Sequence, residues 1–447
     1  MMNLSYNSNL MHKLATTARR GDLLAALDIG SSKVCCLIAR LTDNGALNVL
    51  GIGHHESKGM KSGRIVDMEA AQRAVGLAVQ AAENMAGETI HTVAVNISGV
   101  HTGSHLLHGE LNLTQDEVMA QDLRRIMGYA RDVEVPGHSQ LIHAIATQYR
   151  VDDQTGITDP KGMHGKQLGA QIHAVTATET ALKNRLHCIT SNHLSVEAYC
   201  VDVYAAALAA LTEDDMDLGC TVIDMGAGTT EMAVFIDGQF VFADAIPVGG
   251  AHVTQDIARG LTTSLHHAER LKTLYGHAIR TARDEGDMIE VPQAGDDNAL
   301  HSGGNSFGGN FGGHFVPRSY LTGIIQPRLE EIFELVRARL EASGYAQSAG
   351  RRVILTGGAS QLTGLRDLAA LILDKQVRLA PLNAGHNPNN LRILGLADAT
   401  TGPAFATVCG MLLYLAEHPE EIPARTVPAA AGGSWLQQSW QWLRENW

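Results

Sequence analysis

The chain has 447 residues, of which 45% are hydrophobic and 18% charged, a composition typical of a folded protein with more than one domain. Its formal net charge of -13 argues against sequence-independent binding of nucleic acid, which needs a positive surface that displaces counterions. No apolar run reaches the roughly 18 residues that a membrane-spanning helix needs.

Strand-like apolar runs alternate with helical patterns along most of the chain, which predicts an α/β protein. The first 21 residues are polar, lack the apolar core of a signal peptide and are expected to form a flexible tail. None of the six cysteines forms a Cys-x-x-Cys pair, so a reducing cytoplasm is expected. The elements predicted next, in order, are strands at 23–29, 34–41 and 47–53, a helix at 67–85, a mixed insertion at 89–174 (with strand, hairpin and strand at 99–113), and helices at 180–191 and 204–212.

The opening pattern returns near residue 220. The second half is predicted to contain strands at 220–224, 231–236 and 240–247, helices from 252, at 266–275 and at 324–342, and a strand at 352–356. Residues 295–314 are rich in Gly, Ser, Asn and Asp and are expected to form a mobile loop, because they cannot bury enough apolar surface to order themselves. A Pro/Ala/Gly linker is expected at 419–433, before a separate amphipathic segment at 434–447.

One sequence pattern occurs twice, about 200 residues apart. In each copy an apolar strand ends in Asp-x-Gly, at Asp28 and Gly30 and again at Asp224 and Gly226, and apolar alternation resumes after a few small polar residues. A hairpin tip rich in Gly, Ser and Thr exposes backbone N–H groups that can cradle an anion. The adjacent carboxylate can hold Mg²⁺ or its waters. Two such hairpins, facing each other, would clamp a di- or triphosphate.

A third element is the predicted strand that runs into Gly357 and Gly358. Glycines at this point would let the backbone lie flat against a base or a ribose. The alternative is an ordinary helix-opening turn. In the company of two phosphate turns, the nucleotide interpretation is favoured.

These elements together resemble the actin, Hsp70 and sugar-kinase superfamily, and within it the chain is similar to the FtsA family of bacterial cell-division proteins. The resemblance runs from about residue 23 to the C-terminus and is carried by strings such as LDIGSSKVCCLIA, GIGHHESKGMKSGRIVDMEAA, VIDMGAGTTEMAVF, VPRSYLTGIIQPRLEEIFELV and LTGGASQLTGL. It implies an α/β, actin-like (ribonuclease H-like) fold with duplicated domains in two lobes around a nucleotide cleft. The implied division of the chain is a first core subdomain at 22–88 and 171–215 with a return near 400–418, an inserted subdomain at 89–170, a second core subdomain at 216–250 and 351–399, and an outer subdomain at 251–350.

The resemblance also implies that ATP and Mg²⁺ occupy the cleft. Asp28 and Asp224 would hold the Mg²⁺ through water. The cofactor motifs fall on Asp28, Gly30, Ser31, Ser32 and Lys33 (first phosphate motif), Asp224, Gly226, Gly228, Thr229 and Thr230 (second phosphate motif), and Gly357, Gly358 and Ala359 (adenosine motif).

Three further residues remain open from the sequence. Glu269 and Lys272 match positions that face the ribose and base, although a solvated ion pair at this spacing is the alternative. Asp202, in an apolar run, is either a residue that orients an attacking water or a helix cap. Whether ATP is hydrolysed therefore stays open.

The last fourteen residues form one amphipathic face when placed on a helix, with the apolar side chains on an arc of about 160°. A Trp/Leu face behind a flexible linker is typical of a helix that lies in a membrane interface. A helix docked on the protein itself or in a partner's groove is the alternative. The membrane-facing side chains would be Trp435, Leu436, Trp440, Trp442, Leu443 and Trp447.

The resemblance implies specific partners. The outer subdomain at 251–350 would bind the C-terminal peptide of the tubulin-like division protein FtsZ, and the insertion would meet neighbouring subunits and later division proteins. Self-association into filaments and a place on the cytoplasmic face of the inner membrane at the division site follow from the same resemblance. An actin-like adaptor of pilus assembly and an Hsp70-like ATPase are the alternatives.

Overall fold

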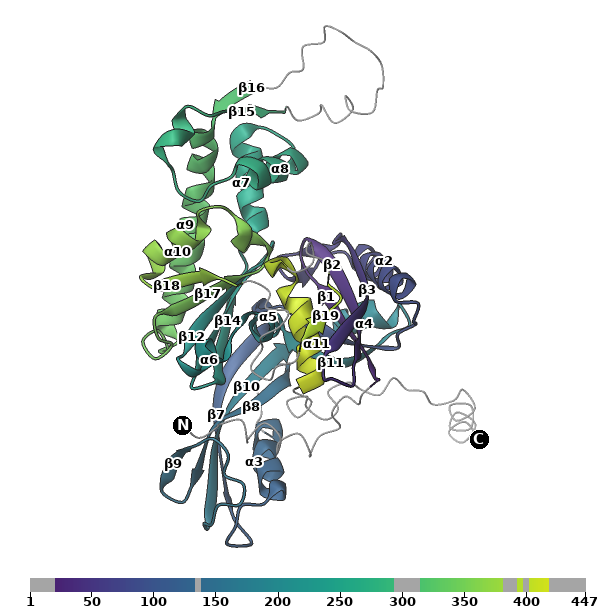
Figure 1. Ribbon diagram of the computed structural model, residues 1–447, viewed down its shortest axis with the longest axis vertical. Helices are drawn as coiled ribbons and strands as arrows, with labels where there is room; N and C mark the ends of the chain where they lie inside the picture. Colours follow the sequence, from purple (N-terminus) through teal and green to yellow (C-terminus); the bar gives the residue numbers. More distant parts are fainter. Residues whose placement is uncertain (1–20, 133–137, 293–313, 381–391, 397–401, 418–447) are drawn as a thin grey trace, which may run out of the picture.

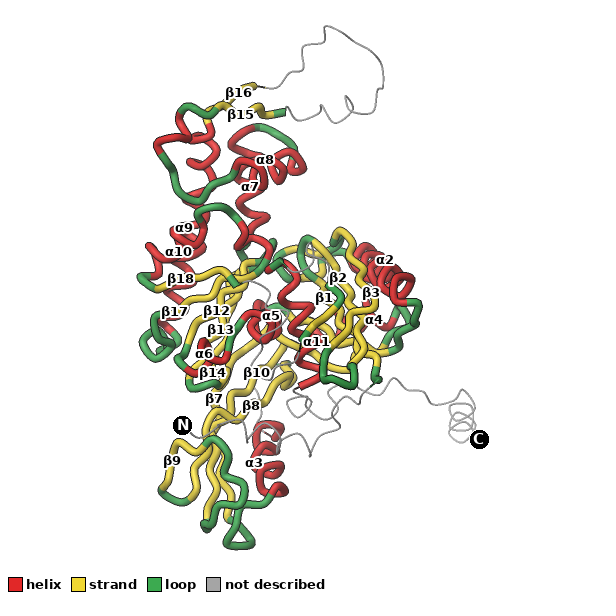
Figure 2. The backbone as a smooth tube through the Cα atoms, in the orientation of Figure 1, coloured by secondary structure: helices red, strands yellow, loops and turns green. Residues whose placement is uncertain are grey.

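The computed structural model describes residues 21–132, 138–292, 314–380, 392–396 and 402–417. Two lobes, each built on an α/β sheet, lie side by side in Figure 1. A mainly β subdomain extends below them, and a mainly helical subdomain rises from the second lobe (Figure 2). The predicted tail helix at 434–447, the linker at 419–433 and nearly all of the predicted loop at 295–314 lie outside the described residues.

The first lobe contains a six-stranded sheet in the order β11-β6-β1-β2-β3-β19. Neighbours β1, β2 and β3 are antiparallel, whereas β6 runs parallel to both β1 and β11. The interior strands are buried on both faces, which explains their nearly continuous apolar runs. The strands are β1 (Leu23–Ile29), β2 (Lys33–Leu41), β3 (Leu47–Glu56), β6 (Thr92–Ile97), β11 (Ser195–Val201) and β19 (Ile393–Leu394).

The second lobe repeats this topology with five strands in the order β14-β13-β12-β17-β18. Its first three strands form the same antiparallel meander, and β17 runs parallel to β12 as β6 does to β1. The prediction of duplicated α/β halves is therefore confirmed. The strands are β12 (Cys220–Met225), β13 (Thr230–Ile236), β14 (Gln239–Ile246), β17 (Arg352–Thr356) and β18 (Gln376–Leu379).

Two helices, α5 and α11, pack against each other and contact strands of the core sheets. Both are almost entirely buried, and their side chains belong to one hydrophobic core that joins the two lobes. Helix α2 packs against β2 and β3, and α10 packs against β18 and α9 (Arg318–Ala342). The helices are α2 (Met68–Ala86), α4 (Glu179–Thr190), α5 (Asp202–Ala210), α6 (Glu213–Asp217), α10 (Leu365–Leu373) and α11 (Ala406–Glu417), with 3-10 turns η4 (Gly358–Gln361) and η6 (Pro403–Phe405) and a small hairpin of β4 (Met60–Lys61) and β5 (Arg64–Ile65).

The inserted subdomain is a four-stranded sheet in the order β7-β10-β8-β9, with α3 packed against it. The range 99–113 was expected to hold two strands around a hairpin; that prediction was wrong, because β7 is one continuous strand that pairs with β10 along its whole length. The range 89–170 assigned to the insertion also includes β6, which lies in the core sheet. The elements are η1 (Gly99–His101), β7 (Thr102–Asn112), α3 (Ala120–Asp132), β8 (Ser139–Val151), β9 (Gln154–Ile157) and β10 (Gln167–Thr178).

A buried polar contact fastens the inserted sheet to the second lobe. His173 lies on β10. Its Nδ1 is 2.9 Å from the carbonyl oxygen of Phe240 on β14, and its Nε2 is 2.6 Å from the hydroxyl oxygen of Ser104. Ser104 in turn accepts from the backbone N–H of Ala243. These contacts fit a neutral ring: Nδ1–H donates to Phe240, Nε2 accepts from the Ser104 hydroxyl, and the Ser104 oxygen accepts from Ala243. The fully buried His173 is therefore part of the joint between the insertion and the second lobe.

This joint makes folding stability depend on pH. Burial lowers the pKa of His173 from its usual 6.5 to about 3. Below pH 6.5 His173 is protonated in the unfolded chain but stays neutral in the folded protein. The free energy of unfolding therefore falls as the pH drops. Between pH 7.5 and 5 we expect His173 to account for about 2 kcal/mol of the loss. Denaturant titrations at both pH values should show a loss smaller by this amount in His173→Gln, whereas the exposed His187→Gln on α4 should behave as wild type.

The outer subdomain of the second lobe is mainly helical (Figure 2). Its long helix α9 begins at Arg318, six residues before the predicted 324, because Leu321 and Thr322 are already buried. Leu321 belongs to a second hydrophobic core, which the outer subdomain shares with β12 and β13. Pro327 lies inside this helix. The elements are α7 (Gly250–Leu261), α8 (Leu265–Tyr275), η2 (Ala282–Glu285), β15 (Met288–Val291), β16 (His314–Pro317) and α9 (Arg318–Ala342).

Candidate functional site

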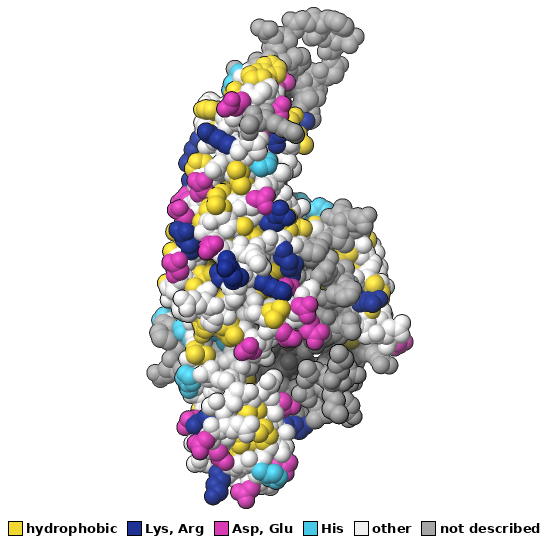
Figure 3. Space-filling model, turned by 60° about the vertical axis from the view of Figure 1, so that its left-hand side comes forward, with side chains coloured by type: hydrophobic (Ala, Val, Ile, Leu, Met, Phe, Trp, Pro, Cys, Tyr) yellow, Lys and Arg dark blue, Asp and Glu magenta, His cyan; other side chains and the backbone are white. Residues whose placement is uncertain are grey.

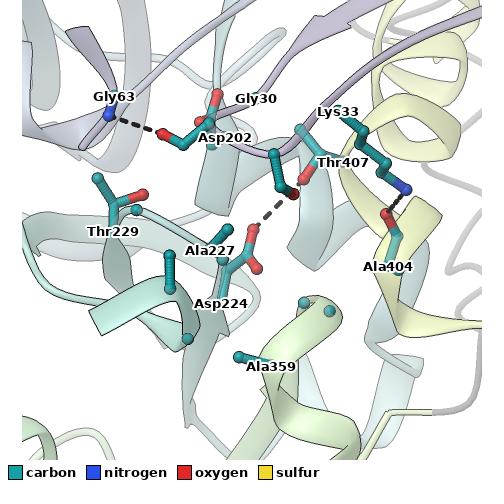
Figure 4. Close-up of a pocket in the computed structure, with 18 of the residues that line it drawn as sticks. Gly30, Lys33, Gly63, Asp202, Asp224, Ala227, Thr229, Ala359, Ala404 and Thr407 are labelled. Carbon is teal, nitrogen blue, oxygen red and sulfur yellow. Dashed lines mark hydrogen bonds between the residues drawn. The ribbon is translucent and has the colours of Figure 1, made fainter. Parts of the chain in front are cut away.

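The two repeated turns face each other across a cavity of about 320 Å³ between the lobes (Figure 4). The β1–β2 turn lines it from the first lobe and the β12–β13 turn from the second. Residues of α5, α7, α8, η4, η6 and α11 also line it. All but one of the predicted cofactor residues line this cavity. Those present are Asp28, Gly30, Ser31, Ser32, Lys33, Asp224, Gly226, Gly228, Thr229, Glu269, Lys272, Gly357, Gly358 and Ala359.

Thr230 is the exception. It is fully buried, and its hydroxyl donates to the carbonyl oxygen of Val248 at 2.8 Å. Side chains alternate between the two faces of a strand, so the residue after Thr229 points away from the cavity. The structure therefore does not place Thr230 among the lining residues, and its hydroxyl holds β13 to the segment that leads into α7.

The two turns approach each other closely at Gly228. A Cβ atom at this position would lie 2.4 Å from the Oγ of Ser31 and 2.8 Å from the Cα of Ser62. Ser31 also accepts a hydrogen bond from the backbone N–H of Gly63 at 3.0 Å. The small hairpin of β4 and β5 is thus held over the first turn, and only glycine at position 228 permits this approach.

The predicted carboxylates Asp28 and Asp224 end strands β1 and β12 and are nearly buried. Asp28 accepts from the side-chain amide of Asn96 at 2.9 Å, and Asp224 accepts from the hydroxyl of Thr407 at 3.3 Å. Burial raises the pKa of Asp28, although Lys33 and Arg185 oppose the shift. Burial, together with the charges of Asp202 and Asp28, raises the pKa of Asp224 to about 7. The cavity therefore holds more negative charge than its surroundings compensate.

This excess of carboxylate fits a divalent cation. One oxygen each of Asp202 and Glu231 is buried without a hydrogen-bond partner. Among the described residues, no three Asp, Glu, His or Cys side chains converge closely enough to hold an ion directly. A hard cation such as Mg²⁺ would therefore be held through its waters and through oxygens of a ligand, as it usually is when it accompanies phosphates.

Asp202 lies in the first turn of α5 and lines the cavity. Val201 is the N-cap residue of this helix, and one carboxylate oxygen of Asp202 has no partner. The helix-cap interpretation left open by the sequence is thus not supported. Burial and the neighbouring charges of Glu231 and Asp28 raise the pKa of Asp202 well above its usual value.

Glu269 and Lys272 form the ion pair that was the alternative to a nucleotide contact, with 2.7 Å between Nζ and Oε2. The ammonium of Lys272 also donates to the carbonyl oxygen of Gly250 and to the hydroxyl of Thr254. Both residues line the cavity at the same time. The ion pair is therefore present and forms part of the cavity wall, and the nucleotide contact stays a prediction.

Several residues of the site were missed by sequence reasoning. Arg185 on α4 is buried beneath the first turn, where its guanidinium donates to the carbonyl oxygen of Ile29 and to Asn96. Glu231 accepts from the hydroxyl of Ser98 at 2.8 Å and from the backbone N–H of Gly99 at 2.9 Å, so it joins the second turn to the start of the insertion. Asn96 had a signal in the sequence, because it is a polar residue within an apolar strand run. Glu231 follows two threonines at the start of its strand and Arg185 lies in a polar helix, so neither residue had one.

Known proteins match the chain over nearly its whole length. It is 39% identical over 444 residues to cell division protein FtsA of Agrobacterium fabrum, with 96% of each chain covered. It is 38% identical over 459 residues to FtsA of Rhizobium meliloti, with 99% of each covered. The chain belongs to the FtsA family of cell-division proteins. The FtsA family model matches residues 221–410, a model of the SHS2 domain inserted in FtsA matches 99–176, and a model of the type IV pilus assembly protein PilM matches 162–279.

Solved structures agree with this membership at the level of the fold. The PilM-PilN type IV pilus biogenesis complex has a TM-score of 0.61 and 16% identity, and covers 89% of this chain and 99% of that one. MreB5 of Spiroplasma citri bound to ADP has a TM-score of 0.51 and 13% identity, with 89% and 97% covered. The FtsA-type chain described here thus has the actin-like fold with the SHS2 insertion. Within its described residues, no helix has both the length and the apolar character needed to cross a membrane.

Proposed function

We propose that this FtsA-family protein binds ATP with Mg²⁺ between its lobes, polymerises, and links FtsZ to the cytoplasmic face of the inner membrane at the division site. It also helps to recruit later division proteins through its insertion. The observation that carries the nucleotide part is the single cavity lined by both copies of the Asp-x-Gly turn and by the double glycine at 357–358. FtsA-family membership carries the division role, and it removes the Hsp70-like and pilus-assembly alternatives.

The chain's own groups have distinct roles in this proposal. Backbone N–H groups of the two glycine-containing turns cradle the phosphates. Asp28 and Asp224 hold the waters of Mg²⁺, which supplies the positive charge that the carboxylate-rich cavity lacks. Gly357, Gly358 and Ala359 line the cavity together with the Glu269–Lys272 pair. They would border the nucleoside, with the ion pair at its edge. Asp202 would orient an attacking water where hydrolysis takes place. Solved structures of MreB 5 from Spiroplasma citri with ADP and with AMPPNP share the fold.

An exposed apolar surface on the outer subdomain supports FtsZ binding there. We call it the outer apolar patch, made of exposed side chains on the end of α8, on the β15–β16 hairpin and at the start of α9. Arg318 ties these elements together, because its Nε donates to the carbonyl oxygen of Tyr275 at 2.9 Å. Apolar side chains gather near this end of the molecule in Figure 3. Exposed aromatic residues are typical anchors for a bound peptide. The patch consists of Leu274, Tyr275, Met288, Phe315 and Tyr320.

Membrane attachment rests on the sequence of residues 434–447. One short amphipathic helix binds a bilayer weakly, so a filament would add the avidity of many tails. This segment carries Arg444 but also Glu445, so attachment would depend on tryptophan burial more than on anionic lipid.

The proposal is tested by co-sedimentation of FtsZ with liposomes of phosphatidylethanolamine and phosphatidylglycerol, with and without this protein and ATP. We expect FtsZ to pellet only when the full-length protein is present. Deletion of residues 434–447 should leave both proteins in the supernatant. Phe315→Ser should leave this protein on the liposomes but reduce bound FtsZ at least about fivefold, as expected for loss of a central aromatic anchor. Leu371→Ser on α10 is the matched control, because Leu371 is also an exposed apolar residue but lies outside the patch. Flotation of the truncated protein with liposomes, as in wild type, would contradict the membrane role.

A further inference from the structure

The side chain of Lys33 is held by the segment that leads into α11. Lys33 follows the first phosphate turn, and its ammonium donates to the carbonyl oxygen of Ala404 at 2.5 Å. The same nitrogen lies 3.5 Å from the centre of the Phe405 ring, a cation–π contact. Figure 4 shows Lys33 reaching toward Ala404 at the edge of the cavity. Both partners belong to η6, in a part of the chain about 370 residues away.

The charges of the cavity single out Lys33. The lining contains two lysines, Lys33 and Lys272, beside a larger number of carboxylates. Lys272 is already paired with Glu269. Among the described residues, Lys33 makes no salt bridge with a carboxylate; its partners are a neutral carbonyl and a ring. Lys33 is therefore the lining cation that an incoming phosphate can recruit without breaking an ion pair.

We propose that η6 competes with the ligand for Lys33: Ala404 and Phe405 hold the ammonium in the nucleotide-free protein, and a nucleoside polyphosphate takes it from them. The inference rests on the proposed nucleotide binding and specifies how this site is regulated. A phosphate oxygen carries a full negative charge and outcompetes a neutral carbonyl as an acceptor. The flexible stem of lysine lets the ammonium move between the two without backbone rearrangement. Phe405 is thus a positioning residue that sets how readily Lys33 is available.

A second contact ties the same segment to the other turn. Thr407, in the first turn of α11, donates from its hydroxyl to Asp224 at 3.3 Å, and it lines the cavity next to Ala404. A hydrated cation at Asp224 competes for that carboxylate as a phosphate competes for Lys33. Residues 403–407 therefore contact both turns, and a Mg²⁺-nucleotide acts on both contacts at once.

The consequence is a change in α11, the last helix described before residues 418–447. Loss of the Lys33 and Asp224 contacts removes two of the bonds that fix η6 and the first turn of α11. Nucleotide binding would thus loosen the segment through which the core is joined to the linker and the tail. Because coupling is reciprocal, weakening the hold of η6 on Lys33 must strengthen nucleotide binding.

This reciprocity makes a sharp test. Phe405→Leu keeps an apolar side chain in a partly buried position but removes the ring from Lys33. We expect it to bind a fluorescent ATP analogue with Mg²⁺ about two- to fivefold more tightly, as expected for loss of one competing cation–π contact. Phe405→Tyr keeps the ring and should bind as wild type does. A purely structural role for Phe405 would give the opposite sign, because a loosened site binds more weakly.

Hydrogen exchange gives a second measurement that needs no variant. In wild type, ATP with Mg²⁺ should slow exchange in the two turns, at 28–34 and 224–230, and speed it at 403–410. In Phe405→Leu, exchange at 403–410 should already be fast without nucleotide. Binding in wild type with unchanged or slower exchange at 403–410, or weaker binding by Phe405→Leu, would overturn the competition. Absence of any nucleotide binding by wild type would instead overturn the proposed function.

Discussion

Asp224→Asn is expected to weaken Mg²⁺-dependent nucleotide binding strongly and, at the same time, to stabilise the nucleotide-free protein. Asp224 is a nearly buried carboxylate in the second turn, and its pKa is raised to about 7 by burial and by Asp202 and Asp28. A carboxyl whose folded pKa is raised favours folding below its unfolded pKa, and this contribution is lost as the pH rises through 7. At pH 8 the folded protein must keep the ionised group, whereas the amide of asparagine carries no charge.

The expected gain at pH 8 is roughly 2–4 kcal/mol, from the size of the pKa shift. It should shrink as the pH falls from 8 to 5, because the wild-type carboxyl then takes up a proton in the folded state. Nucleotide binding should weaken by about 100-fold or more, since the amide cannot replace a charged partner of the hydrated cation. Thermal melts at the two pH values and titration with a fluorescent ATP analogue measure both effects.

The exposed Asp237→Asn in the β13–β14 turn is the matched control. Asparagine accepts its positive φ of 50° as aspartate does, so stability should change by less than about 0.5 kcal/mol at either pH. A stability gain in Asp224→Asn that is the same at pH 5 and pH 8 would show that charge burial is not its cause.

The crowding of carboxylates in the cavity explains why Asp224→Asn should raise stability and weaken nucleotide binding. The cavity gathers carboxylates that the empty protein can accommodate only at a cost, and a hydrated cation with a polyphosphate would relieve their repulsion. The buried Arg185 beneath the first turn compensates part of the charge permanently, through Asn96 and the carbonyl of Ile29. Lys33 compensates another part but is held by η6. Ligand binding would therefore stabilise a site whose residues destabilise the free protein, which is common where function and stability conflict.

The sequence predicted the parts of this molecule that depend on local pattern. Strand β1 and the repeated turns were identified because Asp-x-Gly between apolar runs specifies both the hairpin and its tip. The duplicated topology followed from the second copy at Asp224. These features need only neighbours in the chain, so one sequence is enough to recognise them.

The features that escaped prediction depend on contacts between distant segments. Strand β7 was predicted as two strands around a hairpin, whereas pairing with β10 along its full length keeps it extended. Arg185 reaches the first turn from α4, and Thr407 reaches Asp224 from the far end of the chain. Thr230 was included among the cofactor residues because it continues the second phosphate motif. Side chains alternate along the strand, so its hydroxyl points away from the cavity and donates to Val248. The hydrophobic periodicity of a sequence does not show which distant segments will contact each other in the fold.

The double glycine at 357–358 allows a test in which two adjacent substitutions have different outcomes. Gly357 directly follows β17 and has a φ of 85°, in a region that residues with a Cβ rarely adopt. A Cβ there would also lie 2.2 Å from the Oδ1 of Asp224 and 2.5 Å from the carbonyl oxygen of Met225. At Gly358 the nearest atom to such a Cβ is the Cβ of Ala404, at 3.7 Å, an ordinary contact.

Gly357→Ala is therefore expected to destabilise the protein by about 2–4 kcal/mol and to eliminate nucleotide binding, because it combines backbone strain with displacement of the Asp224 carboxylate. Gly358→Ala should change the free energy of unfolding by less than about 0.5 kcal/mol. Its methyl group still faces the cavity, so it should weaken nucleotide binding without unfolding the protein if the backbone here lies against the nucleoside. Denaturant titration and nucleotide titration of both variants separate the two effects. Equal loss of stability in the two variants would mean that the crowding at Asp224 is not what requires glycine at 357. Normal nucleotide affinity in Gly358→Ala would place the nucleoside elsewhere in the cavity.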